Sequence, residues 1–384
     1  LDADASTRRS FANSGVCVRN ILGTEGNKIY KKDGWYYFLN VCFVGNSPEG
    51  KGLYIRRSRN IYGEGGAVAD ANGFKHAGTY QRCYLGHPED IPTQGALVDD
   101  VAGNWYFLGQ MPDDSAGGRM VYLVPVKWSC QEFPRIEAHS AENFVNLDSK
   151  GLVGSDDFSG TELKHFWCWN HMPDPNFYQL TGSALCLRAQ CRIPCGAKGR
   201  TVWGIRNVLF QKYIHAPWST FSVRLDLTGL EEGQEAGIMH FNGGDEFVAF
   251  YLLAEGKTKY LHLDWTEKAT RRQRPSHQLA SFILNPDHSA LGGSDVQNTI
   301  CEIKNNFVWL RTVIQEKHGG IGEECEFYYS LDGESFTYVK NAPLPEAARF
   351  RGNRIGLYTC NDQTERGYVL FSQVDYKWHE NSSV

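Results

Sequence analysis

The sequence has no long apolar run, no concentrated positive charge and no C-x-x-C cysteine pair, and each absence argues against a class of protein. Its longest apolar runs, residues 121–126 and 247–253, are far too short to span a bilayer. Lys and Arg total 39 against 44 Asp and Glu, and no long basic run provides the positive face that nucleic-acid binding requires. We therefore expect neither a membrane nor a nucleic acid as partner.

The 11 cysteines include no C-x-x-C pair, which argues against zinc ribbons and thioredoxin-like sites. The sequence also lacks the H-E-x-x-H, G-x-S-x-G and EF-hand motifs. Cys186, Cys191 and Cys195 are close enough in sequence to hold one local disulfide, and residues 381–383 form a glycosylation sequon. We therefore expect a secreted, extracellular protein, although the chain begins at Leu1 without a signal peptide.

Short alternating segments separated by Gly, Asp and Asn dominate the chain and predict an all-β fold. Residues 220–227 alternate apolar and polar side chains, which is typical of a half-buried strand. Residues 325–338 predict a hairpin with Asp332 and Gly333 in its turn. Aromatic residues make up 13% of the chain; they suit strand-rich cores and also stack on sugar rings, so composition leaves both interpretations open.

One internal repeat indicates how the strands are organised. Residues 33–38 read DGWYYF, and residues 103–108 read GNWYFL, 70 positions later. Each is a tight turn that leads into an aromatic strand and is followed by further strand-like segments. Repetition of a four-stranded unit is typical of a β-propeller, although two copies are compatible with any all-β fold.

The strand pattern breaks at a polar stretch that starts near residue 138. We therefore expect four parts: blades of a propeller in residues 1–137, a linker in 138–151, a β-sandwich in 152–378 and a polar tail in 379–384.

Residues 24–37, TEGNKIYKKDGWYY, contain the best candidate for chemistry. A carboxylate followed by glycine, Glu25-Gly26, precedes a strand, a turn and a second aromatic strand. In a propeller such a position can project into the central cavity, where partial burial raises the pKa of a carboxyl group. The alternative is a surface glutamate at the start of a strand.

Several segments, in the same order, resemble motifs of glycoside hydrolase family 43. The segment around Glu25 is similar to that family's general-acid motif. The other matching segments are TQGALV at 93–98, GRMVYLVPVKW at 118–128, FWCWNHMPD at 166–174 and RNVLFQK at 206–212. The last two resemble the family's C-terminal sandwich, so the resemblance covers most of the chain.

This resemblance implies a five-bladed β-propeller, of which only the C-terminal blades are present, followed by a concanavalin-like β-sandwich of the jelly-roll type. It implies an inverting hydrolase of β-xylosides or α-L-arabinofuranosides in pentose-containing plant polysaccharides, with xylan among them. Glu25 matches the general acid, and Arg119 matches an arginine near the bound sugar. Gln94 sits where many members of the family carry a cavity histidine, so the resemblance implies that Gln94 and Arg119 bind substrate.

The match is not complete. Asn27 replaces a usual proline, and Thr93 replaces a usual histidine. An inverting hydrolase also needs a second carboxylate as general base. In the family this aspartate, and another that tunes the acid, belong to earlier blades, and neither Asp2 nor Asp4 can be assigned to these roles. We expect the base in an N-terminal part that is missing here; the alternative is a degenerate, non-catalytic carbohydrate-binding relative.

The chemistry requires no cofactor, but the sandwich has candidate ligands for a structural Ca²⁺ ion. Asp156 and Asp157 open this domain and Asp375 lies near its end. Calcium prefers several oxygen ligands, so we expect Asp157 and Asp375 to share an ion. The alternative is a set of solvated turn carboxylates.

Overall fold

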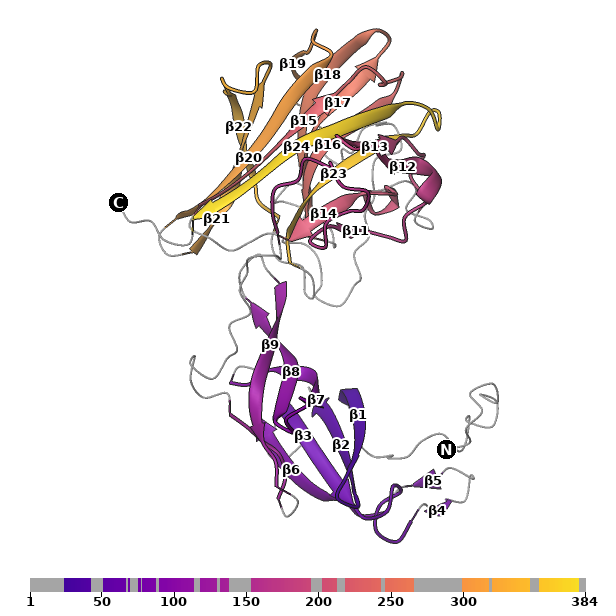
Figure 1. Ribbon diagram of the computed structural model, residues 1–384, viewed down its shortest axis with the longest axis vertical. Coiled ribbons are helices and arrows are strands. Elements are labelled where there is room, and N and C mark those ends of the chain that lie inside the picture. The colour runs from indigo at the N-terminus through magenta and orange to yellow at the C-terminus, as the bar shows by residue number, and fades with distance from the viewer. Residues whose placement is uncertain are drawn as a thin grey trace, which may run out of the picture. The chain divides into compact units, whose positions relative to one another are not determined.

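The computed structural model describes residues 24–42, 51–66, 68–69, 75–76, 78–87, 90–113, 118–129, 132–137, 153–194, 202–212, 218–242, 246–265, 299–317, 320–345 and 352–379. Within these ranges the regular elements are strands and short 3₁₀ helices, without an α-helix, which confirms the all-β prediction. No helix in these ranges has the length and apolar character to cross a membrane. The chain divides into two compact units, Leu1–Pro112 with Arg119–Leu147 and Asp113–Gly118 with Asp148–Val384 (Figure 1).

The first unit contains two four-stranded antiparallel sheets in which neighbouring strands follow in chain order. The first sheet consists of β1 (Thr24–Lys32), β2 (Trp35–Cys42), β3 (Gly52–Ser58) and β6 (Gln81–Gly86). The second consists of β7 (Thr93–Asp99), β8 (Trp105–Asp113), β9 (Gly118–Lys127) and β10 (Arg135–Ile136). A small hairpin joins β4 (Val68–Ala69) to β5 (Lys75–His76).

The internal repeat marks the same position in both sheets. Residues 35–38 start β2 and residues 105–108 start β8, so each copy supplies the second strand of its sheet. The turns before them use left-handed backbone, with φ of 77° at Gly34 and 83° at Gly103. Two four-stranded meanders with this repeat have the strand order of propeller blades.

One hydrophobic core holds both blade-like sheets together. Its buried residues come from both sheets and the segments beside them: Tyr37, Leu39, Val41, Leu53, Ile55, Ile91, Leu97, Phe107, Val124, Val126 and Ile136. The alternation of Tyr37, Leu39 and Val41 along β2 places them on one face of the strand. The edge of Tyr37 meets Trp128 at 4.8 Å between ring centres.

The second unit consists of two seven-stranded antiparallel sheets. In sheet order, the first contains β11 (Cys168–Trp169), β14 (Leu209–Lys212), β23 (Arg354–Asn361), β16 (Gln234–Phe241), β17 (Phe247–Glu255), β18 (Thr258–Trp265) and β19 (Thr299–Glu302). The second contains β12 (Tyr178–Leu180), β13 (Leu185–Arg188), β24 (Tyr368–His379), β15 (Trp218–Asp226), β20 (Phe307–Lys317), β21 (Gly320–Ser330) and β22 (Thr337–Pro343). Two 3₁₀ turns, η3 (Pro175–Phe177) and η5 (Val202–Gly204), complete the described elements.

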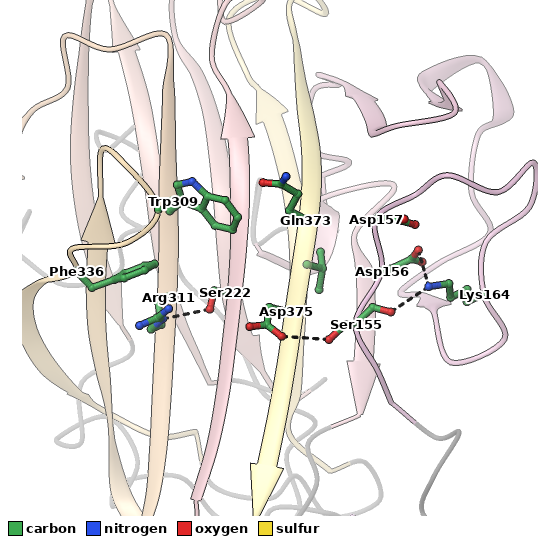
Figure 2. Close-up of a pocket in the computed structure, with 12 residues that line it drawn as sticks. Ser155, Asp156, Asp157, Lys164, Ser222, Trp309, Arg311, Phe336, Gln373 and Asp375 are labelled. Atoms are coloured by element: carbon green, nitrogen blue, oxygen red, sulfur yellow. Dashed lines mark hydrogen bonds and ion pairs between the residues drawn. The ribbon is translucent and has the colours of Figure 1, made fainter.

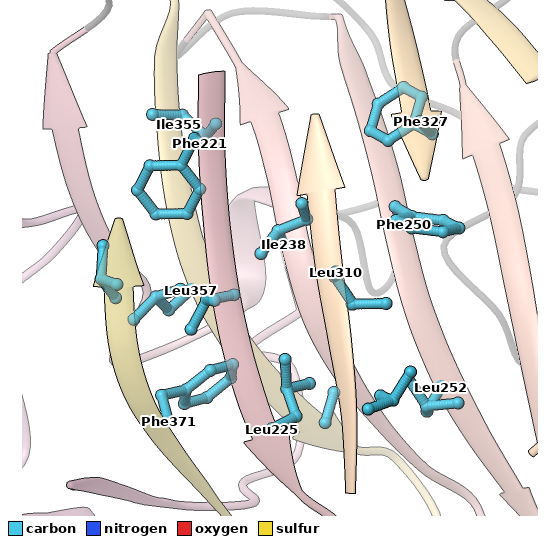
Figure 3. Packing of buried hydrophobic residues seen from close by; sticks show 14 of the residues in the cluster. Phe221, Leu225, Ile238, Phe250, Leu252, Leu310, Phe327, Ile355, Leu357 and Phe371 are labelled. Atoms are coloured by element: carbon cyan, nitrogen blue, oxygen red, sulfur yellow. The ribbon is translucent and has the colours of Figure 1, made fainter. Parts of the chain in front are cut away.

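The two sheets pack against each other over a large aliphatic and aromatic core (Figure 3). Phe221 and Leu225 on β15 are fully buried there, as the alternation of residues 220–227 predicts. The expectation of a half-buried strand is wrong, however, because Ser222 on the opposite face is only 2% exposed. On that face Ser222 lies between two longer cross-strand side chains, Arg311 on β20 and Asp375 on β24, and the Arg311 side chain bonds its hydroxyl.

The hairpin expected at residues 325–338 is present, since β21 pairs with β22. Its loop is longer than a two-residue turn, because the register joins Tyr329 to Thr337. The linker expected at 138–151 lies outside the described residues.

Candidate functional site

Glu25 lies near the start of β1, which is the edge strand of its sheet as far as the residues are described. The pairing of β1 with β2 is interrupted by a bulge between Glu25 and Lys28, and Gly26 in that bulge has a φ of 66°. The Glu25 side chain is exposed, so the expectation of partial burial is wrong. Among the described strands, β2 is the one that pairs with β1.

Gln94 is held against Glu25 by an unusual backbone conformation. Its φ is 52°, which is uncommon for a residue other than glycine, and the pairing of β7 with β8 shifts register between Thr93 and Ala96. The backbones come close here: a Cβ atom on Gly26 would lie 3.4 Å from the Gln94 Cα. Gln94 Nε2 donates a hydrogen bond to Glu25 Oε1.

The other end of the Gln94 side chain is also fixed. Arg119 Nη1 donates to Gln94 Oε1 at 2.6 Å, and Gln110 Nε2 donates to the same oxygen. Two donors at the oxygen leave the amide nitrogen to face the carboxylate. We call Glu25, Gln94, Gln110 and Arg119 the Glu25 cluster; it draws one residue from each of β1, β7, β8 and β9.

The structure therefore brings together Glu25, Gln94 and Arg119, the three residues that the sequence predicts for catalysis and substrate binding. Gln110 was missed. It lies on β8 opposite Thr93, and strand alternation places it on the same side as Leu108, away from the buried Phe107. That alternation is the signal that could have identified it.

The Glu25 cluster offers an exposed carboxyl group whose position is fixed by a neutral amide, with a guanidinium on the far side of that amide. Such a carboxyl group can exchange a proton with a bound molecule. Glu25 is the single carboxylate of this cluster, so the cluster by itself holds one of the two carboxyl groups that an inverting hydrolase uses.

Asp157 and Asp375 line one pocket on the second unit (Figure 2). A β-bridge between Asp156 and Val374 brings the start of this unit beside its last strand. Asp157 Oδ1 accepts hydrogen bonds from the Ser159 hydroxyl and backbone amide, which lower the pKa of the Asp157 carboxyl.

The neighbouring carboxylates have protein partners as well. Asp375 lies 2.6 Å from Lys377 Nζ, and Asp156 lies 3.1 Å from Lys164 Nζ. Asp156 also accepts from the indole nitrogen of Trp167 at 2.8 Å. Across the described parts of the chain, no group of three or more His, Cys, Asp or Glu is arranged to hold a metal ion. The calcium ion at Asp157 and Asp375 stays a prediction.

Cys186 and Cys191 are not joined to each other, and burial raises the pKa of the Cys186 thiol. Cys195, the sequon at 381–383 and both Asp2 and Asp4 lie outside the described residues. Secretion therefore stays a prediction.

The fold and the Glu25 cluster together define an all-β protein with blade-like sheets and a concanavalin-like sandwich. The family described as "Beta xylosidase C-terminal Concanavalin A-like domain" matches residues 155–377. The chain belongs to this family, and with it to glycoside hydrolase family 43.

Two sequences illustrate the similarity along the whole chain. A β-xylosidase of Formosa agariphila is 23% identical over 408 residues, which cover 95% of this chain and 61% of that protein. A putative β-xylosidase of Xylanibacter ruminicola is 25% identical over 384 residues, which cover 95% of this chain and 60% of that protein. The chain thus spans about three-fifths of the length of these relatives.

Solved structures show the same fold. A bifunctional GH43-CE protein of Bacteroides eggerthii matches with a TM-score of 0.65 and 22% identity, covering 94% of this chain and 41% of that one. A xylan β-1,4-xylosidase of Bacillus halodurans matches with a TM-score of 0.61 and 18% identity. The match covers 92% of this chain and 65% of that one. The predicted fold class, propeller blades followed by a concanavalin-like sandwich, is confirmed.

Proposed function

We propose that this chain is the C-terminal part of a glycosidase that hydrolyses β-xylosides or α-L-arabinofuranosides in pentose-containing plant polysaccharides such as xylan. Its relatives named β-xylosidase support this class of substrate. The observation that carries the proposal is the Glu25 cluster, because Gln94 bonds the exposed Glu25 carboxyl group and is itself held by Gln110 and Arg119.

In the proposed reaction Glu25 is the general acid and protonates the oxygen of the leaving group. Gln94 fixes the Glu25 carboxyl group, and Arg119 contacts the sugar in the adjoining space. Proton donation by a positioned side chain contributes roughly 10²–10⁴-fold to the rate of such reactions.

Inversion requires a second carboxylate at about 6.5–9.5 Å from the acid, where it activates the attacking water. We assign this role to an aspartate in sequence that precedes residue 1 of this chain. Glycoside hydrolysis by this route uses no cofactor.

A second candidate function is carbohydrate binding without hydrolysis. The departures at Asn27 and Thr93 favour it, as does the single carboxylate in the Glu25 cluster. Both functions involve a pentose-containing ligand, so binding alone does not separate them.

The deciding experiment is an assay of the full-length gene product on aryl β-xyloside and aryl α-L-arabinofuranoside. Proton NMR during the first turnovers identifies the anomer that forms first. We expect hydrolysis of at least one substrate with the anomer inverted. Tight oligosaccharide binding without turnover would instead establish the second candidate, and a retained anomer would rule out the inverting mechanism.

A further inference from the structure

A pocket of about 520 Å³ lies on the second sheet of the sandwich (Figure 2). Its floor is a row of residues across β20, β15 and β24, in which Ser222 pairs with Arg311 on one side and Asp375 on the other. Arg311 Nε donates to the Ser222 hydroxyl at 3.1 Å. The small serine between two long side chains leaves a hollow whose floor offers both hydrogen-bond donors and acceptors.

One side of the pocket is aromatic. Trp309 and Phe336 both line it, and the Arg311 guanidinium carbon lies 3.3 Å from the centre of the Phe336 ring. Gly333 allows the loop between β21 and β22 to close against Trp309: its φ is 85°, and a Cβ atom there would lie 2.7 Å from the indole nitrogen.

The same loop is held in shape by its own hydrogen bonds. Asp332 Oδ1 accepts from the backbone amides of Glu334 and Ser335, each at 2.8 Å. The Ser330 hydroxyl and these amides lower the pKa of Asp332 to about 2. The aromatic side of the pocket is therefore ordered before any ligand arrives, which reduces the entropic cost of binding.

The other side of the pocket carries Gln373, which has a left-handed backbone with φ of 50°. It lies in a bulge of β24, where the pairing with β15 shifts register between Ser222 and Arg224. Bulges redirect side chains, and a left-handed backbone is unfavourable for residues other than glycine. Here the result is an exposed amide beside the hollow rather than a side chain packed in the core.

The charges select the kind of ligand. Two cations, Arg311 and Lys164, face three carboxylates, Asp156, Asp157 and Asp375, so the lining has more negative than positive groups and an anion gains no net attraction. An apolar ligand would displace water from these charged groups without replacing the hydrogen bonds of that water. A sugar ring suits both sides, because its flat C–H face packs on an aromatic ring while its hydroxyls donate to carboxylates and accept from a guanidinium.

We propose that this pocket binds a neutral oligosaccharide as a second carbohydrate site, separate from the Glu25 cluster. The proposal does not require Glu25 to be catalytic, because every residue that carries it lies in the sandwich.

The test is calorimetric titration of the 384-residue protein with xylotetraose, cellotetraose and citrate. We expect at least one of the sugars to bind with Kd of about 1 mM or tighter, and no binding of citrate. Trp309→Ala should weaken binding at least tenfold, and so should Gln373→Gly, which suits the φ of 50° and therefore preserves the fold. Tyr338→Ala, an aromatic residue that is 53% exposed and does not line the pocket, is the matched control and should bind normally.

The Glu25 cluster is itself proposed to contact sugar, so the titration is repeated with Arg119→Ala. A heat signal that disappears in Arg119→Ala and survives in Trp309→Ala would overturn the proposal. Absence of binding by both sugars, or equal binding by Trp309→Ala, Gln373→Gly and the unaltered protein, would overturn it as well. If circular dichroism shows that Trp309→Ala is unfolded, sugar binding by Gln373→Gly decides the test: normal binding overturns the proposal and weakened binding supports it.

Discussion

Each of the two units holds a cluster with an arginine and at least one carboxyl group, but the two clusters differ in burial. In the Glu25 cluster the carboxyl group is exposed, and the arginine reaches it through the Gln94 amide. In the sandwich, Arg192 is 3% exposed and lies 2.6 Å from Asp362 and 3.7 Å from Glu235. We call these three residues the Arg192 cluster.

This difference separates a cluster that can meet a ligand from one that stabilises the fold. Burial raises the pKa of Glu235 to about 7, although Arg192 opposes the shift. Removing one partner of a buried pair leaves the other charge without compensation, which is strongly destabilising. Glu25 has no such role in the core, so its replacement should change chemistry and leave stability nearly unchanged.

The largest expected effect is on Glu25. In the full-length protein, Glu25→Gln should lower the hydrolysis rate of xylo-oligosaccharides by roughly 10²–10⁴-fold, because the amide cannot donate a proton to a poor leaving group. Steady-state kinetics measure the change. The melting temperature should stay within about 2 °C of the unaltered protein, since surface substitutions rarely exceed about 0.5 kcal/mol; a large drop would contradict a purely chemical role.

The opposite result is expected for the Arg192 cluster. Arg192→Met should destabilise the sandwich by about 3–5 kcal/mol, since it leaves Asp362 and Glu235 without their cation. Urea unfolding measures the loss. The matched control is Arg206→Met: Arg206 makes a more exposed pair with Glu365 at 3.2 Å, so this change should cost at most about 1 kcal/mol. Equal losses of unfolding free energy in Arg192→Met and Arg206→Met would contradict a special stabilising role of the buried Arg192 cluster.

The sandwich should also lose stability in acid through a buried histidine. Burial lowers the pKa of His240 to about 3, while its Nε2 lies 2.9 Å from the Thr312 hydroxyl. In acid the unfolded state therefore binds a proton at His240 that the folded state excludes. The contribution of neutral His240 to the free energy of unfolding is complete above about pH 6.5 and is lost as the pH falls toward 3. Glu235 contributes in the opposite direction, because its raised pKa favours the folded state as the pH falls.

Comparison with His240→Gln isolates the histidine. Urea unfolding at pH 7.5 and pH 5 should show a smaller loss in this variant, since glutamine does not titrate and can still bond Thr312. An identical pH dependence in both proteins would contradict the assignment.

A smaller effect is expected from the support around Glu25. Gln110→Leu removes one of the two donors that orient Gln94, so kcat should fall about tenfold while KM changes little. Leu108→Thr, a change at a 39% exposed position on the same face of β8, is the control and should leave kcat unchanged. If Gln110 has only a structural role, kcat is retained and the melting temperature falls instead.

The smallest effect concerns calcium. If Asp157 and Asp375 share an ion, EDTA should lower the melting temperature of the sandwich by about 2–4 °C, and Asp157→Asn should abolish this sensitivity. An EDTA-independent melting temperature would rule the ion out and leave the carboxylates to their hydrogen-bond and lysine partners.

Local patterns in the sequence predict the elements well and the long-range contacts less well. The repeat at 33–38 and 103–108 identified the two blade-like sheets, because a turn and an aromatic strand are local features. The burial of Ser222 and the role of Gln110 depend on strands that are distant in sequence. The contact of Gln94 with Glu25 further depends on a left-handed φ that no local pattern of residues 93–98 specifies.

The most direct test of Glu25 as the proton donor compares leaving groups. The full-length protein and its Glu25→Gln variant are assayed on aryl β-xylosides whose phenols span a range of pKa. We predict near-normal kcat/KM for the variant with the most acidic phenols and a growing loss as the phenol pKa rises, because only poor leaving groups need protonation. A uniform, mild loss across the series would show that Glu25 does not donate the proton.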